Sequence, residues 1–179
     1  MAQFKAMELG VMVSGSAVLS VVEAMEAYKS MALRILENHG IDNPKKDQWY
    51  PQQAWLDAFK NIADHVGPAT LRMIGEKIPD TAMWPPVVNK VDEALASIDI
   101  AYHMNHRDGE IGHYRFEKTG EKTGKMICNN PYPCDFDFGI IRATSMKFAP
   151  EGTTPLVTHD KSGSCRRKGG NTCTYNISW

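Results

Sequence analysis

The sequence has little net charge and lacks a long apolar run. Its 179 residues carry 20 lysines and arginines against 21 aspartates and glutamates, which gives a formal net charge of −1. A nearly neutral chain has no overall attraction for nucleic acid or for a membrane surface. No apolar stretch is long enough to span a bilayer, and no charged-then-apolar leader opens the sequence. We therefore expect a cytoplasmic protein with no nucleic-acid partner and no membrane partner.

The short motifs of common enzymes are also missing. There is no Gly-x-Ser-x-Gly turn around a nucleophilic serine and no glycine-rich loop that would cradle a phosphate. Ser14 and Ser16 flank a glycine at an expected helix start, where serine usually acts as a cap. Asp135 and Asp137 fall in an expected first helical turn, which favours a role there over acid–base catalysis. We expect no enzymatic activity.

Cysteine is absent from residues 1–127, and the last third of the chain holds all four: Cys128, Cys134, Cys165 and Cys173. The first two bracket a proline-rich turn of five residues, and the other two bracket a basic, glycine-containing turn of seven. Zinc prefers four soft or borderline ligands in a tetrahedron, usually supplied in pairs by two turns. Two thiol pairs therefore indicate a metal site, while disulfides and buried free thiols stay open as alternatives.

A run of three basic residues, 166–168, lies inside the second turn. Such a run could contact an anion. Consecutive charges on a turn are more often simply solvated. We therefore expect this run to be exposed.

Hydrophobic periodicity predicts four helices in the first part of the chain, because apolar residues recur there at intervals of three and four. The expected ranges are 17–38, 51–66, 68–79 and 87–105. The first of these is apolar on more than one side, so it is either central to the core or paired with a second copy of the chain. A homodimer is therefore one expectation.

From residue 112 the period changes to two, which is typical of strands. Strands are expected at 113–117, 125–128, 156–159 and 172–179, with a helix at 135–148. The order predicts an α+β fold, in which an N-terminal helical bundle packs on a four-stranded antiparallel sheet with a helix between the two hairpins. We expect one ligand-binding domain over residues 1–179, mainly helical in 1–106 and α+β in 107–179.

Two segments, PYPCDFDFGII at 131–141 and SCRRKGGNTCTYNI at 164–177, resemble the 4-vinyl-reductase domain. In that family a cysteine opens a helix, a strand follows, and two further cysteines flank a short glycine-containing turn before a closing strand. The same domain forms the sensor half of bacterial activators that detect phenols and xylenes. Its superfamily includes Golgi transport (TRAPP-type) subunits and haem nitric oxide sensors. The resemblance is specific over roughly residues 100–179.

The phenol-sensing members hold a structural zinc through three cysteines and an acidic residue. The resemblance implies that Cys134, Cys165 and Cys173 are the three thiolate ligands here. This chain has Ser162 at the position of the acidic ligand. The fourth ligand is therefore open, with Cys128 as the first candidate and His159 and Asp160 behind it.

The resemblance also implies a sensor module that binds a small hydrophobic or aromatic molecule between helices and sheet and acts through an output protein. The candidate contacts are Trp84, Tyr102, His103, His106 and Tyr114. Each histidine could instead be a structural residue, and Trp84 could be a plug that closes the core. A haem-based gas or redox sensor, with His65 or His103 on the iron, and a tetrapyrrole-binding protein are the alternatives.

Overall fold

The computed structural model describes residues 3–179; the first two residues of the expected domain lie outside this range. The α-helices and two 3₁₀ turns are α1 Gly15–Ala24, η1 Glu26–Tyr28, α2 Lys29–Asn38, α3 Gln52–Thr81, α4 Val91–Met104, α5 Cys134–Lys147 and η2 Arg166–Lys168. The strands are β1 Met12–Ser14, β2 Trp49–Pro51, β3 His106–Arg107, β4 His113–Gly120, β5 Thr123–Asn129, β6 Leu156–His159 and β7 Cys173–Ser178. The expected α+β class is confirmed.

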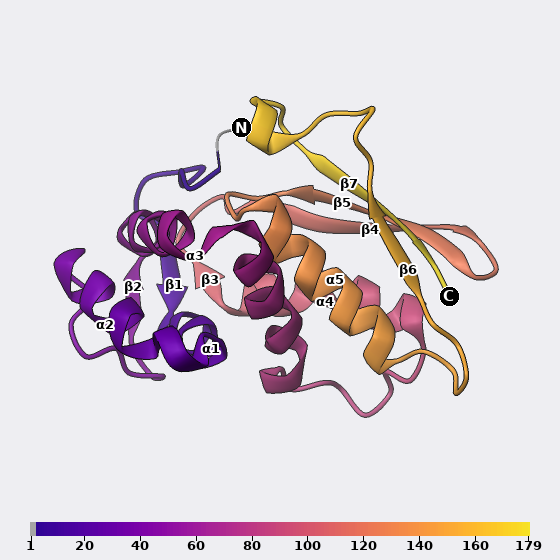
Figure 1. Ribbon diagram of the computed structural model, residues 1–179, viewed down its shortest axis with the longest axis horizontal. Coiled ribbons are helices and arrows are strands. Elements are labelled where there is room, and N and C mark those ends of the chain that lie inside the picture. The colour runs from indigo at the N-terminus through magenta and orange to yellow at the C-terminus, as the bar shows by residue number, and fades with distance from the viewer. Residues whose placement is uncertain (1–2) are drawn as a thin grey trace.

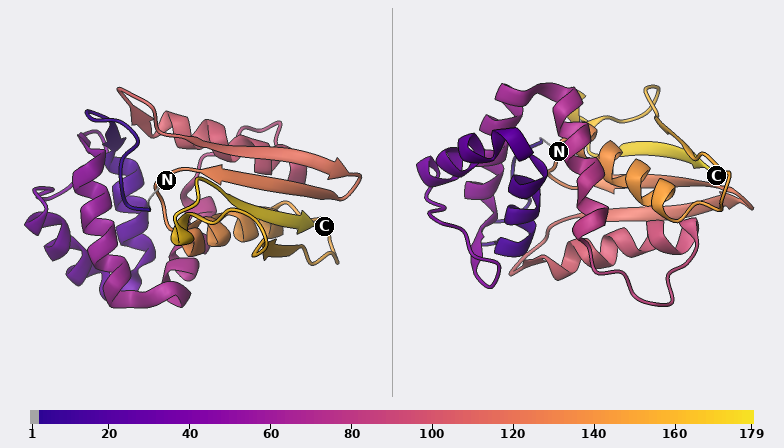
Figure 2. Two further views of the ribbon diagram at one scale, coloured as in Figure 1. Left: turned by 90° about the horizontal axis from the view of Figure 1, so that it is seen from above. Right: turned by 60° about the horizontal axis from the view of Figure 1, so that its bottom comes forward.

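Helices α1 and α2 and the first half of α3 gather at one end of the molecule, and the larger sheet extends from the other (Figure 1). The second half of α3, after Gly67, runs beside α5. The larger sheet has the strand order β4-β5-β7-β6, and all its pairings are antiparallel. Helices α4 and α5 lie along one face of the sheet (Figures 1 and 2). The last strand is inserted between β5 and β6, so residues far apart in the sequence meet at the ends of β5, β6 and β7.

A second, smaller sheet with the order β2-β1-β3 was not expected from the sequence. Val13 in its central strand pairs with Tyr50 on one side and His106 on the other. Each strand has only two or three residues, too few for a periodic pattern to show. This sheet joins the start of the chain to the segment that follows α4.

The helix ends follow local chemistry. The helix expected at 17–38 is interrupted by η1, so α1 and α2 are separate. The expected break at Gly67 is confirmed, because Gly67 has φ 75° and Pro68 follows it. Among residues 3–179, no helix has the length and apolar character needed to cross a bilayer.

Helices α3 and α5 approach each other closely at two glycines, one from each helix. A Cβ atom added to Gly75 would lie 2.2 Å from the carbonyl oxygen of Phe136. One added to Gly139 would lie 2.2 Å from the carbonyl oxygen of Arg72. Because both obstacles are backbone atoms, no rotation of a side chain could make room. The approach of α3 to α5 therefore depends on glycine at both positions.

Replacing Gly139 with alanine is expected to destabilise the fold by about 1–3 kcal/mol, because the two helix backbones would have to move apart. Chemical denaturation followed by circular dichroism measures the change. The control is Met146→Ala on the same helix, at a side chain that is 41% exposed, where the cost should be much smaller. Equal stability of Gly139→Ala and the unaltered protein would contradict the proposed close approach.

Candidate functional site

Three of the four cysteines converge where α5, β7 and the loop before η2 meet. Cys134 is the first residue of α5, Cys173 is the first residue of β7, and Cys165 directly precedes η2. The Sγ atom of Cys134 lies 3.1 Å from that of Cys173, and the Sγ atom of Cys165 lies 3.9 Å from each. All three are free thiols. Zn–S bonds of about 2.3 Å in a tetrahedron place sulfurs about 3.8 Å apart. The two distances from Cys165 match this spacing, whereas the Cys134–Cys173 distance is shorter and would have to lengthen around an ion.

A histidine completes this cluster. One ring nitrogen of His159 and the three sulfur atoms all lie within 4.8 Å of one another. The Nε2 atom of His159 is buried and has no hydrogen-bond partner within residues 3–179, although its ring stacks on Tyr175. A buried polar atom without a partner is costly, and a metal ion would satisfy it. Three thiolates and an imidazole form a common structural zinc set.

The other two candidates for the fourth ligand lie differently. Cys128 is fully buried and pairs with Cys173 across β5 and β7. It is absent from the ligand cluster, and burial raises its pKa well above the usual range. Asp160 accepts hydrogen bonds from the backbone and hydroxyl of Ser162. Of the three candidates, His159 alone is brought together with the thiols.

The surroundings of the cluster favour the thiolate form of Cys173. The hydrogen bond from Cys134 lowers the pKa of Cys173 to about 4, and the nearby guanidinium of Arg166 acts in the same direction against the effect of burial. The same thiol pair raises the pKa of Cys134, which keeps its proton. The backbone N–H of Arg166 donates to Cys173 Sγ at 3.4 Å, and Gln3 Nε2 donates to Cys134 Sγ at 2.8 Å. The donor to Cys173 stabilises negative charge on that sulfur.

The expectation that residues 166–168 are all solvated is wrong for the first of them. The Arg166 side chain points inward and is only 2% exposed, whereas Arg167 and Lys168 are exposed. Its guanidinium donates to the carboxylate of Asp137 and to backbone and side-chain oxygens of Asn130. A further bond of 2.9 Å reaches the carbonyl oxygen of Tyr132. Arg166 therefore ties the loop that carries Cys165 to the start of α5.

Asp137 lies in the first turn of α5, as expected, but it is fully buried. Burial raises its pKa, and the guanidinium of Arg166 opposes that effect. The hydroxyl of Tyr114 donates to Asp137 at 2.6 Å. A buried charge is tolerated only when it is paired and hydrogen-bonded, and Arg166 and Tyr114 meet this need.

Three of the five candidate ligand contacts lie together in the interior. The ring centroid of Tyr102 is 4.5 Å from that of His106 and 5.2 Å from that of Tyr114. The two ring nitrogens of His106 are 2.8 Å from the carbonyl oxygen of Tyr102 and 2.8 Å from the hydroxyl of Tyr132. Burial lowers the pKa of His106 to about 4, so its imidazole is neutral at pH 7.

The other two candidate contacts lie elsewhere. The side chain of His103 is 41% exposed and lies beside Asp99 and His113. Trp84 donates from Nε1 to the carbonyl oxygen of Pro79 at 2.9 Å, and its ring packs on Phe148. Trp84 is partly buried against Phe148 and lies apart from the three interior residues.

Sequence reasoning missed a set of aromatic contacts that fills the interior. Trp55, Phe59, Tyr132 and Phe136 form a continuous set of aromatic contacts, with Phe59 at its centre. Gln52 is fully buried, and its side-chain amide has no hydrogen-bond partner among the described residues. Trp55 and Phe59 belong to the helix expected at 51–66. No local pattern in the sequence links them to Tyr132 and Phe136, which lie more than 70 positions away.

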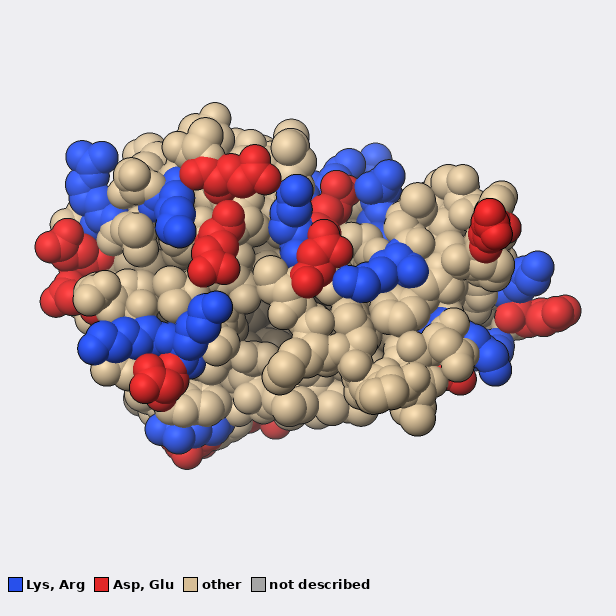
Figure 3. Space-filling view, turned by 90° about the horizontal axis from the view of Figure 1, so that it is seen from below, with Lys and Arg blue, Asp and Glu red and all other residues tan. Residues whose placement is uncertain are grey.

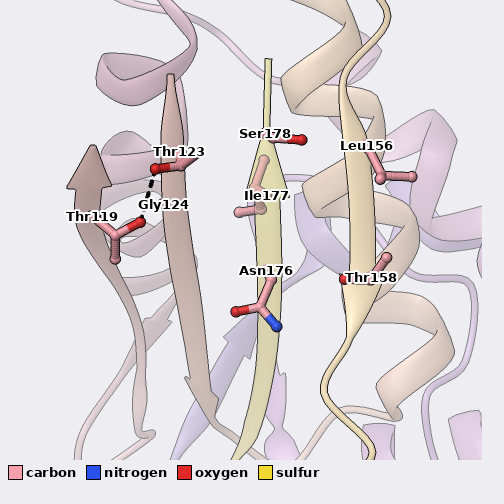
Figure 4. Close-up of a pocket in the computed structure, with 8 residues that line it drawn as sticks. All are labelled: Thr119, Thr123, Gly124, Leu156, Thr158, Asn176, Ile177 and Ser178. Carbon is pink, nitrogen blue, oxygen red and sulfur yellow. Dashed lines mark hydrogen bonds between the residues drawn. The ribbon is translucent and has the colours of Figure 1, made fainter. Parts of the chain in front are cut away.

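Two open hollows lie on the outside of the molecule. One, of about 440 Å³, is lined by Thr119, Thr158, Asn176 and neighbouring residues of β4 to β7 (Figure 4). The other, of about 470 Å³, is lined by polar residues of α3 and by His39. On the face drawn in Figure 3, basic and acidic side chains are interspersed. These hollows do not include the aromatic interior.

Comparison with known proteins identifies the fold. The sequence matches no protein-family profile, and no curated protein matches it significantly. Among solved structures, a mutant of the T. tengcongensis H-NOX protein has a TM-score of 0.67 at 13% identity, and the alignment covers 92% of this chain and 96% of that one. An oxygen-binding H-NOX domain related to soluble guanylate cyclases has a TM-score of 0.66 at 14% identity, covering 92% and 94%.

A third structure, an S. oneidensis H-NOX protein in an Fe(II)NO ligation state, has a TM-score of 0.65 at 13% identity and covers 92% and 98%. The chain thus has the H-NOX fold over nearly its whole length. The likeness is one of fold, at 13–14% sequence identity. The narrower resemblance to the 4-vinyl-reductase domain is not supported by these comparisons.

Proposed function

We propose that this chain is a non-enzymatic sensor module of the H-NOX fold that contains a structural zinc centre. Cys134, Cys165, Cys173 and His159 hold the zinc. The observation that carries this proposal is the convergence of three free thiols and one unpartnered imidazole within 4.8 Å. Four protein ligands leave no open position, which is typical of structural rather than catalytic zinc.

The zinc would cross-link four segments of the chain. Its ligands come from the start of α5, the end of β6, the loop before η2 and the start of β7. Ligands of this kind form no site in the unfolded chain, so metal binding contributes directly to the free energy of folding. The centre would fix the loop that delivers Arg166 to the interior.

The sensor role is supported by the fold. The similar solved structures include an oxygen-binding domain and a protein with Fe(II)NO. For this chain we propose a small hydrophobic or aromatic ligand near Tyr102, His106 and Tyr114, which line the junction of α4 with the sheet. We propose that an output protein or a second copy of the chain reads the signal.

A haem-based gas sensor is the second candidate, and the comparisons favour it over a sensor of aromatic compounds. Three histidines that could face a haem, His106, His65 and His103, do not fit this role, however. Haem iron needs a histidine or another ligand with a free lone pair facing an apolar space. Both ring nitrogens of buried His106 are hydrogen-bonded. His65 and His103, the axial ligands considered from the sequence, are exposed and bonded to their own helices.

Elemental analysis and an absorption spectrum of one purified, untagged sample test both candidates. About one zinc per chain without a Soret band is the expected result, because three thiols and an imidazole, a structural zinc set, gather within 4.8 Å. Iron with a Soret band would favour the haem sensor and would require the aromatic interior to rearrange. A sample with neither metal nor colour would contradict the zinc centre.

A further inference from the structure

A second group of metal-ligating side chains lies on the surface, at the junction of α4 with β4. One ring nitrogen each from His103 and His113 and one carboxylate oxygen of Asp99 all lie within 4.8 Å of one another. The Nδ1 atoms of both histidines are 3.5 Å from Asp99 oxygens. The two imidazole centroids are 4.9 Å apart, with 31° between the ring planes. The thiol–imidazole centre shares none of these residues.

The fold builds this group from two elements. Asp99 and His103 are four residues apart on α4, so their side chains share one helical face. The backbone N–H of Tyr114 donates to Asp99 Oδ1 at 2.8 Å. This bond holds the carboxylate in place and brings His113, the first residue of β4, beside it. The three side chains are therefore positioned by the α4–β4 junction rather than by a mobile loop.

Supporting hydrogen bonds orient two of the three groups as a metal site requires. Metal-binding histidines usually donate their other ring N–H to a carbonyl or a carboxylate, which fixes the orientation of the ring. The Nδ1 atom of His103 lies 2.9 Å from the carbonyl oxygen of Asp99. When this nitrogen carries the proton, the lone pair of Nε2 is free for a metal. The bond from Tyr114 orients the carboxylate in the same way.

An ion pair explains the group less well than a metal does. A protonated imidazole would pair with Asp99. Two protonated imidazoles with centroids 4.9 Å apart would repel each other. An ion pair therefore accounts for one histidine and leaves the second without a role. A cation between three ligands accounts for both.

We propose that Asp99, His103 and His113 form a second, surface site for a divalent cation such as Zn²⁺ or Ni²⁺. Imidazole is a preferred ligand for both ions, and a carboxylate completes a mixed nitrogen and oxygen set. Three protein ligands leave coordination positions for water or for a ligand atom from solution. The side chains are partly exposed, so the ion can exchange with solution.

Titration of the full chain with Ni²⁺, followed by calorimetry and by ¹H–¹⁵N spectra, tests the site. We expect binding of one Ni²⁺ per chain, with paramagnetic broadening centred on the amides of residues 112–115. His113→Ala should weaken this binding tenfold or more. Asp99→Asn should do the same while keeping an oxygen acceptor for the N–H of Tyr114.

Two controls separate this site from other metal binding. His65→Ala removes an exposed histidine of α3 and should leave the affinity unchanged. Cys165→Ser, which alters the thiol–imidazole cluster, should also leave the broadening at residues 112–115 in place. Absence of Ni²⁺ binding, or equal affinity in His113→Ala and the unaltered chain, would overturn the proposal.

Discussion

Replacing Cys165 with serine is expected to abolish stoichiometric zinc and to lower the melting temperature by about 10 °C. The cysteine thiolate binds zinc, whereas a serine hydroxyl keeps its proton at neutral pH. Cys165 is only partly buried, so the exchange of sulfur for oxygen costs little packing. Loss of a structural metal removes several kcal/mol of folding free energy, and each kcal/mol shifts the melting temperature of a chain of this size by about 2–4 °C. Elemental analysis and scanning calorimetry measure the two effects.

A matched pair of variants decides the fourth ligand. His159→Ala should lower the zinc affinity strongly, because the imidazole lies within the cluster. Cys128→Ala should keep one zinc per chain, because Cys128 lies outside it. The opposite pattern would restore Cys128 as the ligand. Full retention of zinc in Cys165→Ser would reject the site as a whole.

The sequence predicted much of this fold for a physical reason. Long periodic segments record which face of a helix or strand is buried, so α3, α4, α5 and the four strands of the larger sheet were foreseen. The apolar intervals of three and four also predicted a buried face on α3 and on α4. In the structure these faces are buried, at Trp55, Phe59, Leu95 and Ile98. Strands of two or three residues are too short to show a periodic pattern, so the smaller sheet was missed.

The candidate site was foreseen only in part. Three cysteines at the ends of expected elements could be grouped from spacing and resemblance, and the structure brings them together. The pairing of β6 with β7, which sets His159 opposite Tyr175 and near Cys173, depends on strand order that local sequence does not encode. Arg166 was misjudged for a related reason. Arg166 opens a run of three basic residues, which resembles a solvated turn, and its partner Asp137 lies 29 positions away.

Replacing Arg166 with methionine is expected to destabilise the protein by about 3–5 kcal/mol, because it leaves the buried carboxylate of Asp137 without its cation. Methionine keeps much of the side-chain length, so the loss is chiefly electrostatic. Chemical denaturation at neutral pH measures it. Arg167→Met is the matched control, since the Arg167 side chain is 53% exposed and its pair with Asp135 should contribute about 0–1 kcal/mol.

A double variant separates the charge from the packing. Asp137→Asn alone leaves the guanidinium of Arg166 buried without a counter-charge, so it should also be costly. Arg166→Met combined with Asp137→Asn removes both charges, and we expect it to cost less than the sum of the two single changes. Costs that simply add would mean that the two side chains do not act as a pair.

The backbone N–H of Arg166 also donates to Cys173 Sγ. A shift of this loop in Arg166→Met should therefore weaken zinc binding as well, which Arg167→Met should not do. A joint loss of stability and zinc affinity would identify Arg166 as the residue that couples the metal centre to the interior of the fold.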